Sequence, residues 1–487
     1  MNICLSLYST RLILDALSVS DYGIYAVVGG VVVMLGFLTN GLLVTTQRYI
    51  SYYHGRNDRP YVAKVFANSL VLHVAFGLAI ALILVLLKAW FFGGVLNIPS
   101  DRVAAAEGIY YVTIALLFVT IVISPYKASF VAHEDIVYVS VIEIFDGIIK
   151  LMFAFILAWV SSDRLIVYGF MMLAIQVMNL LAFSVYGTMK YDECRLHLKH
   201  GTLSASVTRQ LMGFAGWTIY SMGTLAARNQ GVAIVINHFF GTIANAALGV
   251  SAQVNGAVLF VSSSIINAMN PQIMKTEGSG DRQRVLLLAS QESKYSSILL
   301  LLVSIPLLTE LPNILPVWLK EVPDDTVMFC SFALVTCIVD QFTIGLNTVN
   351  RAQGQIGLYT ILLFTPKLLC LPIGWWLLDT GHTLQSVLWT VFITEALTSF
   401  CRIPYLKYSA GLDIMDYLRR TLLPLLPLVI GMVTFCWVCT QLLSFQYRFL
   451  LTIPLSVLVG MAMVWLFCLQ AEERHYILSL VRSWKDR

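Results

Sequence analysis

The most constraining feature of this sequence is a succession of long apolar segments joined by short polar connections. Each segment runs for about 20 residues, the length that an α-helix needs to cross the hydrocarbon core of a membrane. Only 12% of the residues are charged, which is about half the share found in soluble proteins. Lipid forces each element to satisfy its own backbone hydrogen bonds, and continuous apolar runs favour helices over a barrel. We therefore predict an all-α, polytopic membrane protein.

About fourteen membrane-spanning helices account for these segments. They cover residues 1–17, 22–46, 64–93, 104–130, 135–160, 164–189, 209–237, 242–268, 290–316, 326–349, 356–378, 384–405, 420–443 and 448–470. With the N-terminus in the cytoplasm, Lys and Arg residues lie on the cytoplasmic side in an excess of about four to one. Both termini are therefore expected in the cytoplasm. The first span is short, and the sequence leaves open whether its N-terminus is complete.

The two halves of the chain resemble each other in three loops. The loop at 95–101 (VLNIPSD) matches 318–325 (WLKEVPDD), 54–58 (HGRND) matches 277–281 (EGSGD), and 131–136 (VAHEDI) matches 351–356 (RAQGQI). Six spans per repeat is an even number, so the halves have the same orientation and imply a substrate cleft between two parallel lobes.

This repeat predicts the division of the chain. We expect an N-terminal six-helix lobe at 1–190, a cytoplasmic linker at 191–208 and a second six-helix lobe at 209–407. Residues 408–487 then form two additional transmembrane helices and a cytoplasmic tail.

Several motifs point to one family. They are 6–30 (SLYSTRLILDALSVSDYGIYAVVGG), 45–51 (TTQRYIS), 217–225 (WTIYSMGTL), 254–258 (VNGAV), 270–275 (NPQIMK) and 318–323 (WLKEVP). Together they resemble the Wzx-type polysaccharide-biosynthesis flippases of the multidrug/oligosaccharidyl-lipid/polysaccharide exporter superfamily. The resemblance implies a MATE-like fold of two six-helix lobes, often followed by two further helices.

The resemblance also implies a function. It predicts a flippase that translocates undecaprenyl-pyrophosphate-linked oligosaccharide across the bacterial cytoplasmic (inner) membrane for surface polysaccharide assembly. We expect an ion-coupled, alternating-access monomer without a cofactor, with Na⁺ or H⁺ as the coupling ion. Its partners would be the lipid-linked oligosaccharide, membrane lipids and polysaccharide-assembly proteins, with no nucleic acid.

Two other functions stay open. A cation-coupled multidrug antiporter has the same fold, and its cavity should be acidic or aromatic. A membrane-embedded polysaccharide polymerase or ligase fits less well, because its sugar chemistry needs a large outer loop and the outer connections here are short.

Cationic and amide side chains are the candidates for substrate binding. Arg11 and Arg228 lie within spans, where charge is costly and therefore suggests function, and Arg48 lies at the cytoplasmic end of the second span. A guanidinium can bind a phosphate with two parallel hydrogen bonds. Static ion pairing, of Arg11 with Asp15 for example, is the alternative. Asn255 and Asn270 are candidates for sugar contact, although bonds between helices explain such residues equally well.

Charged residues at membrane depth in each half are the candidates for ion coupling. In the first half Glu143, Asp146 and Lys150 follow a spacing that places them on one face of the fifth span. In the second half the corresponding charges are Asp340, Lys367 and Glu395. Such groups form proton relays in transporters, but they also form static networks that hold helices together.

Overall fold

The computed structural model describes residues 12–13, 16–17, 21, 23–25, 28–29, 35–95, 98–99, 101–195, 202–319, 321–443, 445, 447–470 and 473–474. The regular secondary structure of these residues is helical, and the chain divides into two compact units, Met1–Gly223 and Thr224–Arg487. The predicted all-α class is confirmed.

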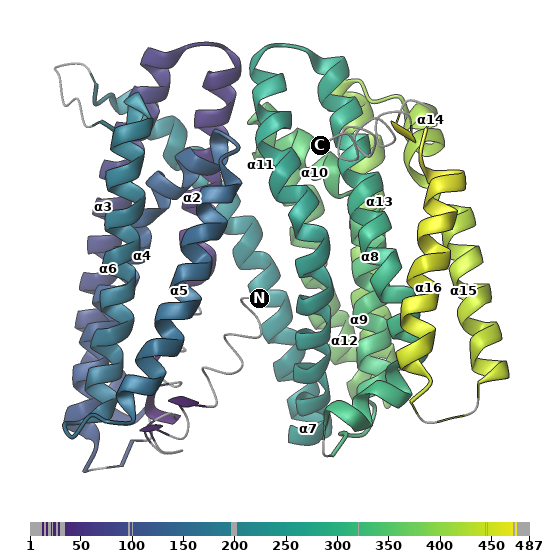
Figure 1. Ribbon diagram of the computed structural model, residues 1–487, viewed down its shortest axis with the longest axis horizontal. Coiled ribbons are helices and arrows are strands. Elements are labelled where there is room, and N and C mark those ends of the chain that lie inside the picture. The colour runs from purple at the N-terminus through teal and green to yellow at the C-terminus, as the bar shows by residue number, and fades with distance from the viewer. Residues whose placement is uncertain are drawn as a thin grey trace, which may run out of the picture. The chain divides into compact units, whose positions relative to one another are not determined.

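From residue 35 onward, the described part of unit 1 consists mainly of long helices (Figure 1). They are α2 (Gly36–Gly55), α3 (Arg59–Trp90) with η1 (Phe91–Val95), α4 (Val103–Ala132), α5 (Ile136–Leu157), α6 (Arg164–Lys190) with η2 (Asp192–Cys194), and the start of α7 (Ala205–Gly278). Its core lies where α4 packs against α3 and α6, and the buried rings and aliphatic chains of Ile109, Tyr110, Leu165 and Ile175 fill it.

Unit 2 contains the rest of α7 and the helices that follow it. They are α8 (Arg282–Trp318), α9 (Thr326–Gln341), α10 (Ile344–Gln353), α11 (Ile356–Leu363), η3 (Thr365–Leu369), α12 (Cys370–Asp379), α13 (Leu384–Ala410), α14 (Ile414–Tyr417), η4 (Leu418–Leu422), α15 (Leu425–Leu442), α16 (Phe449–Met463) and η5 (Val464–Cys468). The C-terminal pair, α15 and α16, packs against α8.

The predicted spans agree with these helices. From the second to the fourteenth, each predicted span overlaps a helix, whereas most of the first lies outside the described residues. Within the described part of the chain, nine helices are long and apolar enough to cross a membrane, or ten if α9 and α10, which meet at 49°, count as one. The long element α7 is itself two helices that meet at Gly241, whose φ of 76° is readily adopted only by glycine.

The internal repeat is visible in the backbone. The turn before α3 contains Asn57 with φ 58°, and the turn before α8 contains Gly280 with φ 85°. Asp58 and Asp281 then cap these helices through their side chains, which accept hydrogen bonds from backbone N–H groups. The two halves therefore begin equivalent helices by the same local device.

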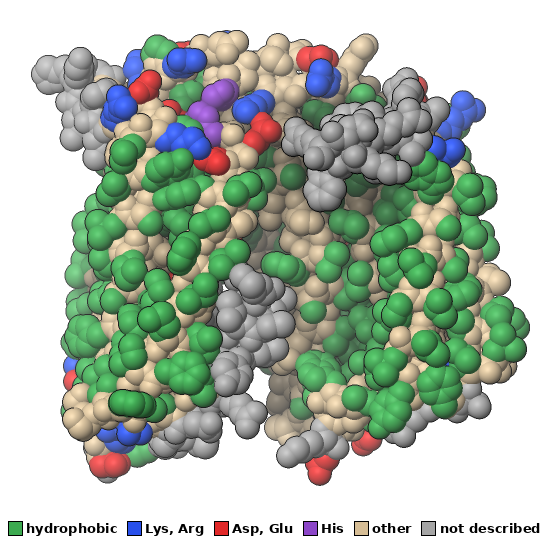
Figure 2. All heavy atoms as spheres, in the orientation of Figure 1, with side chains coloured by type: hydrophobic (Ala, Val, Ile, Leu, Met, Phe, Trp, Pro, Cys, Tyr) green, Lys and Arg blue, Asp and Glu red, His purple; other side chains and the backbone are tan. Residues whose placement is uncertain are grey.

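The exposed surface matches a lipid environment. Large apolar side chains such as Leu86, Trp159, Phe260 and Trp437 are exposed on the helices, and a continuous apolar surface of this extent would be rare on a soluble monomer. Figure 2 shows hydrophobic side chains over the middle of the visible face of each unit, with charged side chains nearer its ends. The chain is therefore a polytopic membrane protein.

Candidate functional site

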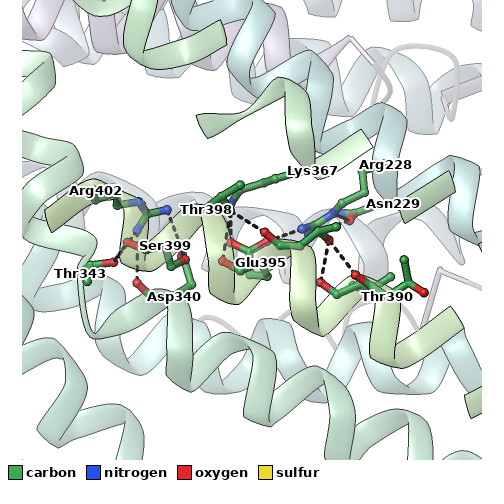
Figure 3. A network of polar contacts seen from close by, with 12 residues as sticks. Arg228, Asn229, Asp340, Thr343, Lys367, Thr390, Glu395, Thr398, Ser399 and Arg402 are labelled. Carbon is green, nitrogen blue, oxygen red and sulfur yellow. Dashed lines mark hydrogen bonds and ion pairs between the residues drawn. The ribbon is translucent and has the colours of Figure 1, made fainter. Parts of the chain in front are cut away.

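Four elements of unit 2 bring charged side chains together in its interior (Figure 3). Arg228 comes from α7, Asp340 from α9, Lys367 from η3, and Glu395 and Arg402 from α13. We call these five residues the unit 2 charge network. Pro366 lies where α11 gives way to η3, because proline cannot supply the N–H that a continuous helix requires, and Lys367 follows directly.

Glu395 is the centre of this network. One of its oxygens accepts a hydrogen bond from Arg228 Nη1, and the other accepts one from Lys367 Nζ. The side chains of Glu395 and Lys367 are 5% and 3% exposed. At such burial an unpaired charge would be very unfavourable, so each of these charges depends on its partner.

The second ion pair lies one to two turns further along α13. Arg402 Nη2 is 2.6 Å from Asp340 Oδ1, and Ser399 Oγ donates to the same oxygen at 3.1 Å. Arg402 Nη1 also donates to Thr343 Oγ1 at 3.2 Å and to the Asp340 carbonyl at 3.3 Å. Thr343 lies at the break between α9 and α10, where helical hydrogen bonds end. Arg402 therefore binds both a carboxylate and the backbone at a broken helix.

The network has an excess of positive charge. Three cations, Arg228, Lys367 and Arg402, share the carboxylates of Glu395 and Asp340. Arg228 is the most exposed of the three cations, and its neighbours Asn229 and Gln230 are exposed, whereas Lys367 and Arg402 are buried. An anionic group at the Arg228 end would balance the charge.

Four of the residues predicted as site candidates thus meet in one place, namely Arg228, Asp340, Lys367 and Glu395. Arg402 was not among the predicted candidates, because it falls at the cytoplasmic end of its span. Its position seven residues after Glu395 puts both on one face of a helix, and this spacing was the signal that could have identified it.

The first-half candidates lie in separate contacts of unit 1. Glu143 pairs with Lys127 of α4 at 2.7 Å, whereas Asp146 pairs with Lys150 one turn away at 2.7 Å. Asp146 also accepts a hydrogen bond from Asn179 of α6 at 3.3 Å. These contacts link α5 to its neighbours.

The other basic candidate of unit 1 lies among aromatic rings. Arg48 is buried, and its guanidinium carbon is 4.5 Å from the centre of the Tyr49 ring, 4.8 Å from Tyr52 and 5.3 Å from Phe214. Such rings attract a cation through their π faces. Arg11 lies outside the described residues.

The two asparagine candidates differ in their surroundings. The buried oxygen of Asn255 has no hydrogen-bond partner among the described residues, whereas Asn270 accepts a hydrogen bond from Thr348 of α10 at 2.9 Å. Within the same described part of the chain, no group of three or more His, Cys, Asp or Glu residues is arranged to hold a metal ion.

No protein-family model and no curated protein sequence matches this chain, but several solved structures do. A MATE transporter in its straight conformation matches with a TM-score of 0.73 at 13% identity, covering 85% of this chain and 94% of its own. A MATE transporter from Vibrio cholerae matches with a TM-score of 0.71 at 14% identity, with the same coverage.

A third similar structure is a MOP superfamily transporter from Pyrococcus furiosus, described as having a binding pocket of reversed polarity that suggests a different function. It matches with a TM-score of 0.71 at 12% identity, covering 84% of this chain and 93% of its own. The chain therefore has the fold of the MATE transporters and the MOP superfamily.

Proposed function

We propose that this protein is a flippase that translocates undecaprenyl-pyrophosphate-linked oligosaccharide across the bacterial inner membrane for surface polysaccharide assembly. The observation that supports the proposal most strongly is the positive surplus of the unit 2 charge network, in which three cations share two carboxylates. The motif resemblance described above provides the substrate class.

The chemistry of a pyrophosphate suits this network. An anion entering an apolar protein interior loses its hydration, and only cationic partners offset that loss. Arg228 is the cation best placed to make this contact, because it is the most exposed of the three cations in the network. In this proposal Arg228 binds the pyrophosphate while Glu395, which also accepts a hydrogen bond from Lys367, holds the Arg228 guanidinium in place.

The remaining candidates have auxiliary roles in this proposal. Arg48 and Arg11 stay candidates for phosphate contact in the first half of the chain, and Asn255 and Asn270 would contact sugar hydroxyls. Na⁺ or H⁺ would couple transport through Glu395, Asp340 and Lys367, or through Glu143, Asp146 and Lys150. The protein would work as a monomer with both termini in the cytoplasm, alongside polysaccharide-assembly proteins.

A cation-coupled multidrug antiporter is the second candidate function. It is favoured by the similar solved structures, one of which is described as an outward-facing multidrug resistance MATE transporter. The charge of the network argues against it, because a cationic drug would be repelled by the surplus positive charge. The reversed polarity of the binding pocket described for the Pyrococcus furiosus transporter supports the idea that this fold accommodates binding sites of either charge.

Binding of a defined pyrophosphate lipid tests the proposal. The full-length protein in lipid nanodiscs is titrated with undecaprenyl pyrophosphate, and Arg228→Ala, Arg228→Lys and the exposed-surface control Arg419→Ala are compared. Arg228→Ala should weaken binding about 10- to 100-fold, the effect of losing charge-assisted hydrogen bonds. Arg228→Lys should recover part of the loss, because it keeps the charge without the planar fork. Since Glu395 keeps Lys367 as a partner, Arg228→Ala should still fold.

Two results would contradict the flippase. One is equal affinity of the wild type, Arg228→Ala and Arg419→Ala for undecaprenyl pyrophosphate. The other is gradient-driven export of ethidium from proteoliposomes by a wild type that does not bind the pyrophosphate lipid, which would establish the antiporter instead.

A further inference from the structure

A second buried carboxylate in unit 2 lies apart from the charge network. Glu292 of α8 is 0% exposed. Its Oε1 is 3.0 Å from Thr348 Oγ1 of α10, and Thr348 Oγ1 is 2.9 Å from Asn270 Oδ1 of α7. The other carboxylate oxygen, Oε2, has no hydrogen-bond partner among the described residues.

If Glu292 were ionised, this cluster would have too few hydrogen-bond donors for its acceptors. Thr348 has one hydroxyl hydrogen but contacts two oxygens, and a carboxylate and an amide oxygen both only accept. A proton on Glu292 would provide the missing hydrogen. Exchanging the oxygen and nitrogen of the Asn270 amide would satisfy Thr348 but would still leave Oε2 without a donor. Burial without donors favours the neutral form of a carboxylic acid.

The nearest cation along the helix is engaged elsewhere. Lys294 lies two residues after Glu292, but its Nζ is 2.8 and 2.9 Å from the two oxygens of Glu473. Arg351 of α10 is the cation close enough to act on Glu292 through space, and it also acts on Tyr359. Tyr417 of α14 is also near Glu292, and Arg402, which pairs with Asp340, acts electrostatically on this tyrosine as well.

The first half of the chain shows that the fold does not need a carboxylate at this position. Ser69 and Glu292 each lie ten residues after the first residue of their helices, α3 and α8, which the internal repeat relates. The hydroxyl of Ser69 forms hydrogen bonds with Thr46 of α2, the counterpart of the second half of α7, and with His73 of α3. A neutral serine therefore occupies, in the first half, the position that Glu292 occupies in the second.

We propose that Glu292 is a proton-binding site, protonated while it is buried between α7, α8 and α10. Arg351 would stabilise the ionised form whenever rearrangement of these helices admits water to the carboxyl group. That this proton drives transport rests on the proposed function. That Glu292 binds a proton does not depend on it.

Infrared difference spectroscopy of the purified full-length protein tests proton binding directly. The carbonyl stretch of a protonated carboxylic acid is separate from that of a carboxylate, and it should be present at neutral pH in the wild type and absent in Glu292→Gln. The matched control is Glu310→Gln, since Glu310 is also fully buried on α8 but pairs with Arg448 at 3.1 Å. That variant should keep the band.

A band that persists in Glu292→Gln would overturn the proposal. If Glu292→Gln does not fold, Thr348→Val serves instead, because removing the hydroxyl partner should shift the band, and an unshifted band would also overturn it. A Na⁺-dependent rise in thermal stability that Glu292→Gln abolishes would identify a metal cation as the ligand and likewise contradict a proton. Failure of the wild type to transport any lipid-linked sugar would contradict the flippase but would leave these spectra valid.

Discussion

At the scale of single residues, the consequence of removing a charge depends on how many partners it has. Glu395 pairs with both Arg228 and Lys367, and its side chain is 5% exposed. Asp340 neutralises Arg402, and its side chain is 29% exposed. Water can therefore reach Asp340 more easily than Glu395 when the pairing changes.

We predict that Glu395→Gln destabilises the protein more than Asp340→Asn. Removing one partner of a buried ion pair costs about 3–5 kcal/mol, because the remaining charge is left without compensation. The apparent unfolding temperature of each purified variant in the same detergent measures the difference. The double variant Glu395→Gln/Lys367→Met should regain part of the loss, since it removes the buried cation as well. A double variant less stable than Glu395→Gln would contradict this electrostatic explanation.

At the scale of helices, polar contacts join the segment that follows η5 to α8. Glu473, which follows η5, pairs with Lys294 and accepts a hydrogen bond from Tyr295. Burial raises the pKa of Glu473, but the hydrogen bonds from Lys294 and Tyr295 outweigh burial and hold this pKa below its usual value. Lys294 Nζ also donates a hydrogen bond to the Cys468 carbonyl at 3.3 Å, which joins the end of η5 to the same lysine.

This depressed pKa predicts a dependence of stability on pH. The contribution of Glu473 is present above the pKa of an unfolded glutamate, about 4.3, and is lost as pH falls through the lower pKa of the folded state. Wild type should therefore be more stable than Glu473→Gln at pH 7, and the difference should shrink at pH values below about 4. Thermal unfolding of both proteins across this range measures it. If the difference in stability between the wild type and Glu473→Gln stays constant down to pH 3, the ionised carboxylate of Glu473 is not what stabilises this contact with α8.

At the scale of the whole molecule, the positive-inside distribution predicts which loops face the cytoplasm. Asp324 and Ser279 are exposed residues in two connections that flank α8 and should lie on opposite sides of the membrane. In a protein with its native cysteines replaced, Asp324→Cys should react with a membrane-impermeant maleimide in intact cells, and Ser279→Cys should react only after the membrane is permeabilised. The reverse pattern would contradict the predicted topology.

The sequence by itself determined the fold class and the order of the helices. In lipid an unpaired backbone group has no water to bind, so each long apolar run must become a helix. The internal repeat could also be recognised from the sequence, because its turns depend on local residues. Asn57 and Gly280 adopt a positive φ, and Asp58 and Asp281 cap the helices that follow.

The tertiary structure alone decided which charged residues meet. Arg228, Asp340, Lys367 and Glu395 come from four elements far apart in the chain, and the rotation and packing of each helix determine whether their side chains face one another. The sequence marks these residues as costly in a membrane but does not provide their partners. The burial of Glu292 shows the same limit, because a carboxylate nearly three turns inside a helix can be hydrated or enclosed, and the packing of α7 and α10 around it encloses this one.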